Sequence, residues 1–181
     1  MAQRWIVTAL GKDRPGIVAG VTGILYKLGC NLEDSAMTRL EGEFAIMLIF
    51  STSTKMSEEQ LLRAFKPLEQ RLKLVVHLKS LARNETGTPR KQGRSYLISV
   101  YGADRPGLVF RVADILSRSK INVTDVHTHR SAGGPPQLYL MLLEVEIPSS
   151  VSLPALERRL KAQGKALRVE LSLRPSEADV L

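Results

Sequence analysis

The sequence predicts an α+β chain made of two copies of one module, each with the element order βαββαβ. The main observation is an internal repeat, because the stretch GKDRPG at 11–16 returns as GADRPG at 102–107, 91 positions later. An alternating apolar run precedes each copy, and an apolar pattern of helical period follows it. The same offset also superposes Asn31 on Asn122 and Arg39 on Arg130. So many agreements at one offset indicate a duplicated module of roughly 80 residues.

The first strand and helix of module 1 lie on either side of this stretch. Residues 4–10 are apolar and rich in β-branched side chains, and Gly11 ends them, as expected of a buried strand. Asp13 can then cap a helix whose first turn contains Pro15. Spacings of three and four give this helix one apolar stripe, formed by Ile17, Val18, Val21, Ile24, Leu25 and Leu28. Gly29 is a typical C-terminal stop.

A hairpin and a second helix complete module 1. Residues 31–39 and 43–50 are predicted as strands joined by a tight turn at Glu41-Gly42. Ser57 opens a helix with acidic residues in its first turn, and we expect Pro67 to kink or interrupt it. Its inner face is formed by Leu61, Leu62, Phe65, Leu68 and Leu72. Residues 74–81 alternate and close the module as its last strand.

The rest of the chain repeats this order after a linker. Residues 82–94 are almost free of apolar side chains and are predicted as the linker. Module 2 then covers 95–174, with strands at 95–101, 122–130, 138–147 and 167–173 and helices at 106–119 and 153–164. Its hairpin loop at 131–136 is longer than the first, which we count as a three-residue insertion. The tail, 175–181, has no pattern and is expected to be loose.

This order predicts one sheet per module, four-stranded and antiparallel, with both helices on one face. Strand one of each module must be central, which explains its apolar composition. The expected core residues of module 1 are Val7, Val21, Ile24, Leu25 and Met47, and those of module 2 are Ile98, Val112, Ile115, Leu116 and Met141.

Charge and cysteine content restrict the possible functions. The formal net charge is +8, but residues 1–85 carry 12 basic and 9 acidic side chains and residues 86–181 carry 14 and 9, so the charge is spread evenly. A solvated basic surface explains this better than a nucleic-acid patch. The single cysteine, Cys30, excludes an internal disulfide. With no signal core and no membrane span in the sequence, we expect a soluble cytoplasmic protein.

The turn after strand one is the candidate ligand site. Gly11 and Gly16 remove side chains there, so a small carboxylate could approach backbone N–H groups at a positively polarised helix end. Asn31 starts the neighbouring strand and offers both donors and an acceptor to an amino acid. A good helix start and a turn residue would explain the same residues without any ligand.

The segment 11–34, GKDRPGIVAGVTGILYKLGCNLED, resembles the opening of an ACT domain, a small-molecule regulatory module with a ferredoxin-like fold. The tandem arrangement resembles the glycine cleavage system transcriptional repressor family. The resemblance implies an amino-acid ligand, glycine or serine first, bound between paired modules whose sheets lie edge to edge. Matched by position, the implied contacts are Gly11, Asp13, Arg14, Pro15, Gly16, Asn31, Asp104, Arg105, Pro106, Gly107 and Asn122. Lys120 and Ile121 replace Gly29 and Cys30, so the second copy departs from the pattern.

The resemblance implies a non-catalytic regulator without a cofactor, acting through a protein partner such as a transcription factor, and a homodimer is compatible with it. One alternative is weak nucleic-acid binding, although the segment 44–48 of strand three contains only one aromatic, Phe44, where an RNA-recognition sheet needs several. Another is the detached regulatory part of an amino-acid or folate enzyme. His127 and His129 share a strand face but have no third metal ligand nearby in the sequence. Cys30 lacks a paired histidine motif, and no catalytic motif is present.

Overall fold

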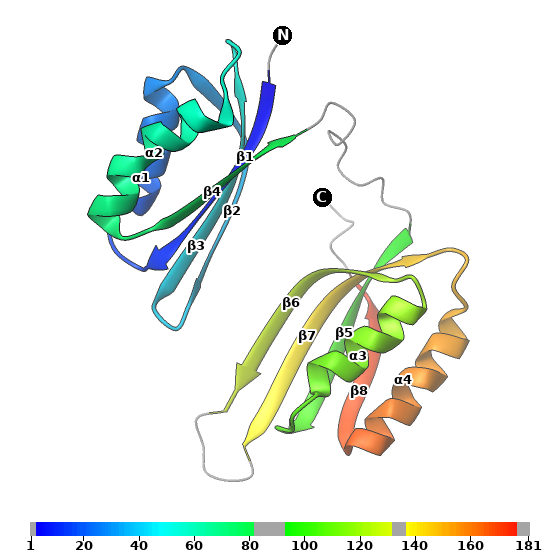
Figure 1. Cartoon of the computed structure of the whole chain (residues 1–181). Coiled ribbons are helices and arrows are strands. Elements are labelled where there is room, and N and C mark those ends of the chain that lie inside the picture. Colours follow the sequence, from blue (N-terminus) through cyan, green and yellow to red (C-terminus); the bar gives the residue numbers. More distant parts are fainter. Residues whose placement is uncertain (1–2, 82–92, 132–136, 177–181) are drawn as a thin grey trace. The chain divides into compact units, whose positions relative to one another are not determined.

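The computed structural model describes residues 3–81, 93–131 and 137–176, and the chain divides into two compact units (Figure 1). Module 1 forms a sheet of order β2-β3-β1-β4 in which neighbouring strands are antiparallel. Its elements in chain order are β1 (Gln3–Lys12), α1 (Ile17–Lys27), β2 (Cys30–Leu40), β3 (Glu43–Thr52), α2 (Glu58–Leu72) and β4 (Val75–Leu81). The predicted βαββαβ order and the central first strand are confirmed.

Module 2 repeats the arrangement with a sheet of order β6-β7-β5-β8. Its elements are β5 (Gly93–Ala103), α3 (Leu108–Arg118), β6 (Asn122–Arg130), β7 (Leu138–Pro148), α4 (Leu153–Leu167) and β8 (Val169–Pro175). Strand β5 begins two residues inside the predicted linker, and the rest of that linker, 82–92, lies outside the described residues. Of the predicted loose tail, Pro175 belongs to β8 and Ser176 donates its N–H to the Ser95 carbonyl, while 177–181 lie outside the described residues.

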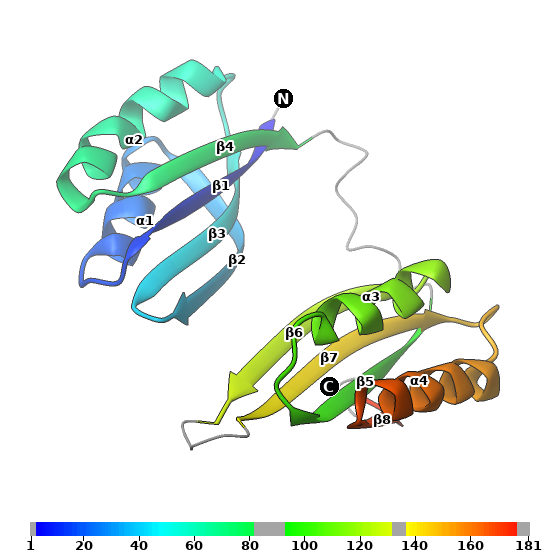
Figure 2. The ribbon, with the colours of Figure 1, turned by 60° about the horizontal axis from the view of Figure 1, so that its bottom comes forward.

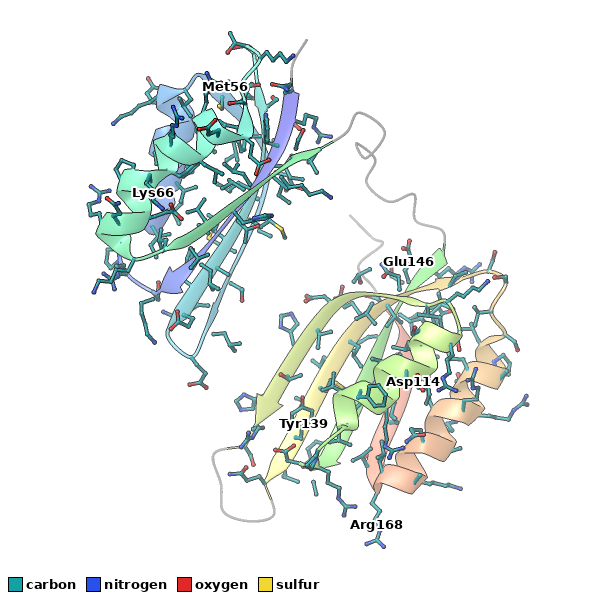
Figure 3. All side chains as sticks on the ribbon, in the orientation of Figure 1. Met56, Lys66, Asp114, Tyr139, Glu146 and Arg168 are labelled. Atoms are coloured by element: carbon teal, nitrogen blue, oxygen red, sulfur yellow. The ribbon has the colours of Figure 1, made fainter. Side chains whose placement is uncertain are left out.

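In each module both helices cover one face of the sheet (Figure 2), and side chains fill the space between the layers (Figure 3). Alternate residues of the central strand point into this core, as Trp5, Val7 and Ala9 do in β1. Module 2 buries Ile98 and Val100 in the same way. The predicted core residues are buried with two exceptions: Ile24 is half-buried, and Met47 is 45% exposed.

The position of Met47 exposes an error in the predicted hairpin alignment. Val7 pairs with Leu48, and its equivalent Ile98 pairs with Leu143, which lies 95 positions after Leu48 rather than 94. The insertion therefore has four residues, not three. Because side chains alternate along a strand, a shift by one residue changes the face on which each side chain lies. Met141 therefore corresponds to the buried Ile46, and Met47 lies on the open face of the sheet.

The structure also corrects the predicted cap of α1 and the predicted interruption of α2. Helix α1 begins at Ile17, after Gly16, and no side chain caps it, so Asp13 is not its cap. Helix α2 continues through Pro67 to Leu72 without interruption. Its N-terminus is a capping box, in which Ser57 and Gln60 each accept a hydrogen bond from the backbone N–H of the other. Most strands are one to four residues longer than predicted, because the ladder hydrogen bonds continue past the apolar runs.

Candidate ligand-binding turn

The turn between β1 and α1 is held against the β2–β3 hairpin. The N–H of Asp13 donates to the Gly42 carbonyl over 2.9 Å. The carboxylate of Asp13 lies 3.4 Å from a guanidinium nitrogen of Arg39 on β2. The carboxylate that the sequence suggested as a helix cap therefore joins the turn to the neighbouring hairpin.

Module 2 repeats this attachment. The N–H of Asp104 donates to the Gln137 carbonyl over 2.8 Å, and the Asp104 carboxylate lies 3.2 Å from Nε of Arg130. Arg39 and Arg130 were not among the predicted site residues, although their coincidence at the repeat offset was a signal for them. The repeated aspartate thus has a structural reason that is independent of any ligand.

Gly16 and Gly107 shape the start of the helices that follow. Their φ angles are 95° and 89°, in the left-handed region that favours glycine. Neither α1 nor α3 has a side-chain cap, so no side chain accepts from the first-turn N–H groups. These groups and the helix dipole make this end attractive to an anion.

A hollow of about 440 Å³ lies at this turn in module 1. Arg14, Pro15 and Gly16 line it together with Ala19 of α1 and Phe44 of β3. In module 2, Phe110 stands at the position of Ala19 and is 71% exposed. A bulky side chain thus stands beside the second turn, where the first has only a methyl group.

Gly11 and Gly102 have a packing role. A Cβ on Gly11 would lie 2.8 Å from a methyl carbon of Leu74, and one on Gly102 would lie 2.7 Å from a methyl carbon of Val169. Both glycines therefore allow the start of the last strand to approach the first. The opening at the turn belongs to Gly16, where a Cβ would have no neighbouring atom within 4 Å.

Asn31 and Asn122 lie far from the turn within their own modules. Asn31 pairs with Ser51, whereas the turn follows the end of β1 at which Lys12 pairs with Glu43. The eight residues from Asn31 to Arg39 correspond to about 26 Å along β2. Asn122, paired with Glu146, lies at the corresponding end of β6. One module alone therefore does not bring its asparagine to its own turn.

Two ionisable groups near Asn31 have shifted pKa values. A hydrogen bond from Ser51 and a second from Arg4, whose Nε lies 2.7 Å from the carboxylate, lower the pKa of Glu33. Burial raises the pKa of the Cys30 thiol, which therefore stays protonated to higher pH. This agrees with a packing role for Cys30.

The other candidate groups form no site in the part of the chain that the structure describes. His127 lies 2.9 Å from the Asp125 carboxylate, but no cluster of three potential metal ligands occurs among the described residues. Likewise, no helix within those residues combines the length and apolar character needed to cross a membrane.

Comparison with known proteins identifies both modules. Residues 3–79 and residues 96–164 each match a family model described as the ACT domain. The chain belongs to the ACT-domain family. A relative of 36% identity, a UPF0237 protein of Streptococcus pneumoniae, matches over 77 residues, which cover 42% of this chain and 88% of that protein.

Longer relatives match both ACT modules. The glycine cleavage system transcriptional repressor of Escherichia coli is 28% identical over 173 residues, covering 94% of this chain and 87% of that protein. Among solved structures, an unknown protein from Galdieria sulphuraria has a TM-score of 0.79 at 23% identity, covering 97% of this chain and 99% of that one. A candidate glycine cleavage system transcriptional repressor has a TM-score of 0.68 at 21% identity, covering 96% and 97%. The ACT modules and the repressor-like relative support a regulatory role.

Proposed function

We propose that the chain is a non-catalytic regulator that binds a small amino acid, glycine or serine first, at the Asp13–Gly16 turn. It would act through a protein partner, such as a transcription factor, in the control of amino-acid metabolism. The observation that carries the proposal is the uncapped start of α1, which lies beside a hollow that Gly16 lines. The repressor-like relative supports the regulatory part of the proposal.

The expected chemistry is simple recognition. The carboxylate of the ligand would accept hydrogen bonds from the first-turn N–H groups of α1, where the helix dipole favours an anion. Its amino group requires an acceptor, which Asn31 or Asn122 can supply only from another module because each lies far from its own turn. A ligand held this way would join two modules and could change their pairing.

The turn of module 1 is the better candidate. Ala19 leaves its hollow open, whereas Phe110 stands beside the turn of module 2. Asp104, Arg105, Pro106 and Gly107 repeat the backbone arrangement and remain predicted contacts of a second, more restricted site. The cytoplasmic location also stays a prediction.

Calorimetric titration with the common amino acids tests the proposal. Glycine or serine is expected to bind the parent chain, and the asparagine that reaches the turn from another module, tested by Asn31→Ala and Asn122→Ala, is expected to contribute a contact worth about 1–3 kcal/mol. Loss of that contact corresponds to roughly 5- to 150-fold weaker binding. A parent chain that binds none of the amino acids would overturn the proposal.

A further inference from the structure

A groove of about 730 Å³ runs between α1 and α2 on the side of the helices away from the sheet. The two helices lie side by side over the sheet of module 1 (Figures 1 and 2). Small residues dominate its walls: Ala19, Gly20 and Gly23 on α1, with Ala64 and Pro67 on α2. This volume lies in the range of ordinary ligand sites, which is about 300–1,000 Å³.

The glycines of α1 make this groove in two ways. A Cβ on Gly20 would lie 2.5 Å from Cδ1 of Leu68, so glycine there allows the helices to pack closely around Leu68. Nothing lies within 4 Å of the Cβ position of Gly23, so packing between the described residues does not require glycine there. Gly23 instead leaves the backbone of α1 open to an occupant. The lining extends from Gly16 to Leu28, about 18 Å or three helical turns.

A cation stands at each end of the groove. Helix α2 ends at Leu72, just before β4 pairs Val75 with Leu10, so Arg71 lies at the end where α1 begins. Lys27 lies at the other end, in the last turn of α1. Both are exposed, no acidic residue lines the groove, and neither cation forms an ion pair with any residue in the described segments.

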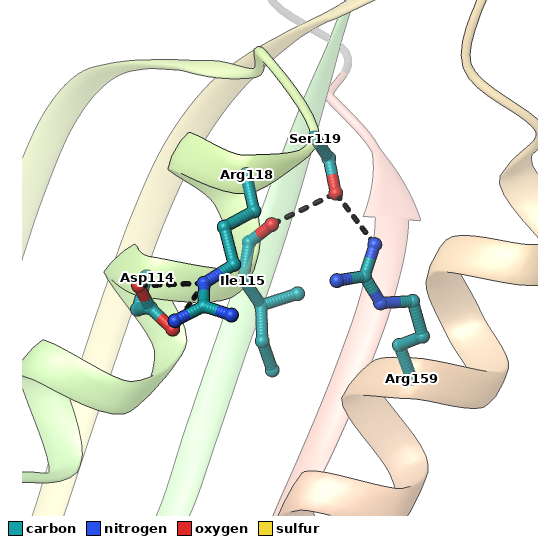
Figure 4. A network of polar contacts seen from close by, with 5 residues as sticks. All are labelled: Asp114, Ile115, Arg118, Ser119 and Arg159. Carbon is teal, nitrogen blue, oxygen red and sulfur yellow. Dashed lines mark hydrogen bonds and ion pairs between the residues drawn. The ribbon is translucent and has the colours of Figure 1, made fainter.

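Module 2 has larger side chains at the equivalent positions. Phe110, Arg111 and Asp114 occupy the positions of Ala19, Gly20 and Gly23. The carboxylate of Asp114 lies 2.9 Å from Nε of Arg118, the equivalent of Lys27 (Figure 4). On α4, Arg159 stands at the position of Ala64 and donates to the Ser119 hydroxyl over 3.1 Å. Within the described segments, the open groove and its unpaired cations therefore belong to module 1 rather than to the repeated fold.

We propose that this groove binds an amphipathic helix of a protein partner, about three turns long, with an acidic side chain near each end of its apolar stripe. The small residues allow the close backbone approach that helix packing requires, and the two cations match the acidic ends. A second copy of the same face is disfavoured, because it would bring cations against cations. The inference deepens the proposed function by placing its protein partner, and it rests on that function for the existence of a partner.

The groove also touches the proposed ligand site. Gly16 and Ala19 line both the groove and the hollow at the turn. A helix seated in the groove would therefore contact the turn that binds the amino acid. Occupation of one site is expected to change the affinity of the other.

A displayed library of helical peptides about three turns long, selected against the full chain, tests the inference. We expect the enriched peptides to carry Asp or Glu near both ends of an apolar stripe. Gly23→Trp, which fills the groove where there is space, and the double change Lys27→Glu/Arg71→Glu should each weaken binding of these peptides by roughly tenfold or more. The matched double change Lys55→Glu/Lys79→Glu alters the net charge equally on exposed residues outside the groove and should have little effect.

Three results would overturn the inference: no enriched peptide, enriched peptides without the acidic residues, or equal binding to the parent and to both groove variants. Thermal unfolding verifies that the variants are folded. If Gly23→Trp is not folded, the double variant Lys27→Glu/Arg71→Glu still tests the groove. Titration of the parent chain with amino acids tests the proposed function separately. If the peptides do not bind the groove, the amino-acid titration still tests the proposed function. If no amino acid binds, the peptide selection still tests the groove.

Discussion

Gly16 and Gly23 both have open space where a Cβ would stand, but their backbones differ. Gly16 has φ 95°, whereas Gly23 lies in α1 and is not among the residues of positive φ. Gly16→Ala should therefore destabilise the protein by about 1–2 kcal/mol because of left-handed strain. Gly23→Ala should stabilise it by about 0.5–1 kcal/mol, since alanine loses less entropy in a helix. Urea unfolding of the two variants checks this pair, and a stabilising Gly16→Ala would contradict the assigned turn.

Cys30 provides a test of local burial at the start of β2. Because burial raises its thiol pKa, less thiolate is present near pH 8 than in an exposed cysteine. We expect Cys30 to react with a disulfide reagent more slowly in the native chain than in urea, and its rate to keep rising above the pH at which the unfolded thiol levels off. A native rate equal to the unfolded rate would show that the side chain is not protected.

The residues of the turn mark where prediction from sequence succeeded and where it failed. Gly16 was correctly singled out as a residue that opens the turn, since its glycine requirement is local. Asp13 was wrongly given a capping role, because its partner Arg39 is 26 residues away and only the folded sheet brings the two together. For the same reason Gly11 was not recognised as a contact of Leu74, which lies directly before β4.

At the scale of elements, Pro67 is an internal weakness of α2. A proline in the helix interior lacks the N–H that would donate to the carbonyl four residues earlier. Pro67→Ala should therefore stabilise module 1 by up to about 3 kcal/mol. The reciprocal change in α4, Ala162→Pro at the equivalent exposed position, should destabilise module 2 by about 3 kcal/mol or more. Calorimetric unfolding measures both variants. If their unfolding temperatures do not shift in opposite directions, Pro67 does not destabilise α2.

The existence and order of the twelve elements in the described residues could be predicted, because apolar periodicity and the repeat are two independent signals for the same module. The register of β3 and β7 could not. The hairpin loop at 131–136 gives no internal marker of how many residues are inserted, so an error of one residue exchanged Met47 with Ile46 in the predicted core. Strand pairing, which fixes this count, is a long-range property.

At the scale of the whole molecule, the charge of +8 raises the question of nucleic-acid binding. Phe44 of β3 is half-buried and packs against the core, and Phe50 of the same strand is fully buried. We therefore expect DNA and RNA oligonucleotides to bind weakly, without sequence preference, and with an affinity that falls steeply as salt rises. Fluorescence anisotropy over a salt series measures this, and tight binding to one sequence at physiological salt would reverse the interpretation.

The central claim is that a small amino acid binds at the Asp13–Gly16 turn of module 1. Its most direct test is calorimetric titration of glycine and serine into the parent chain and into the variant Ala19→Phe. This variant gives module 1 the phenylalanine that module 2 has at the equivalent position, Phe110. Ala19 is exposed, so folding should be preserved, and His77→Phe on the exposed face of β4 serves as the matched control. We predict that binding to the control equals that to the parent and that Ala19→Phe weakens it by roughly tenfold or more. Equal binding by all three proteins would contradict the claim and place the ligand elsewhere.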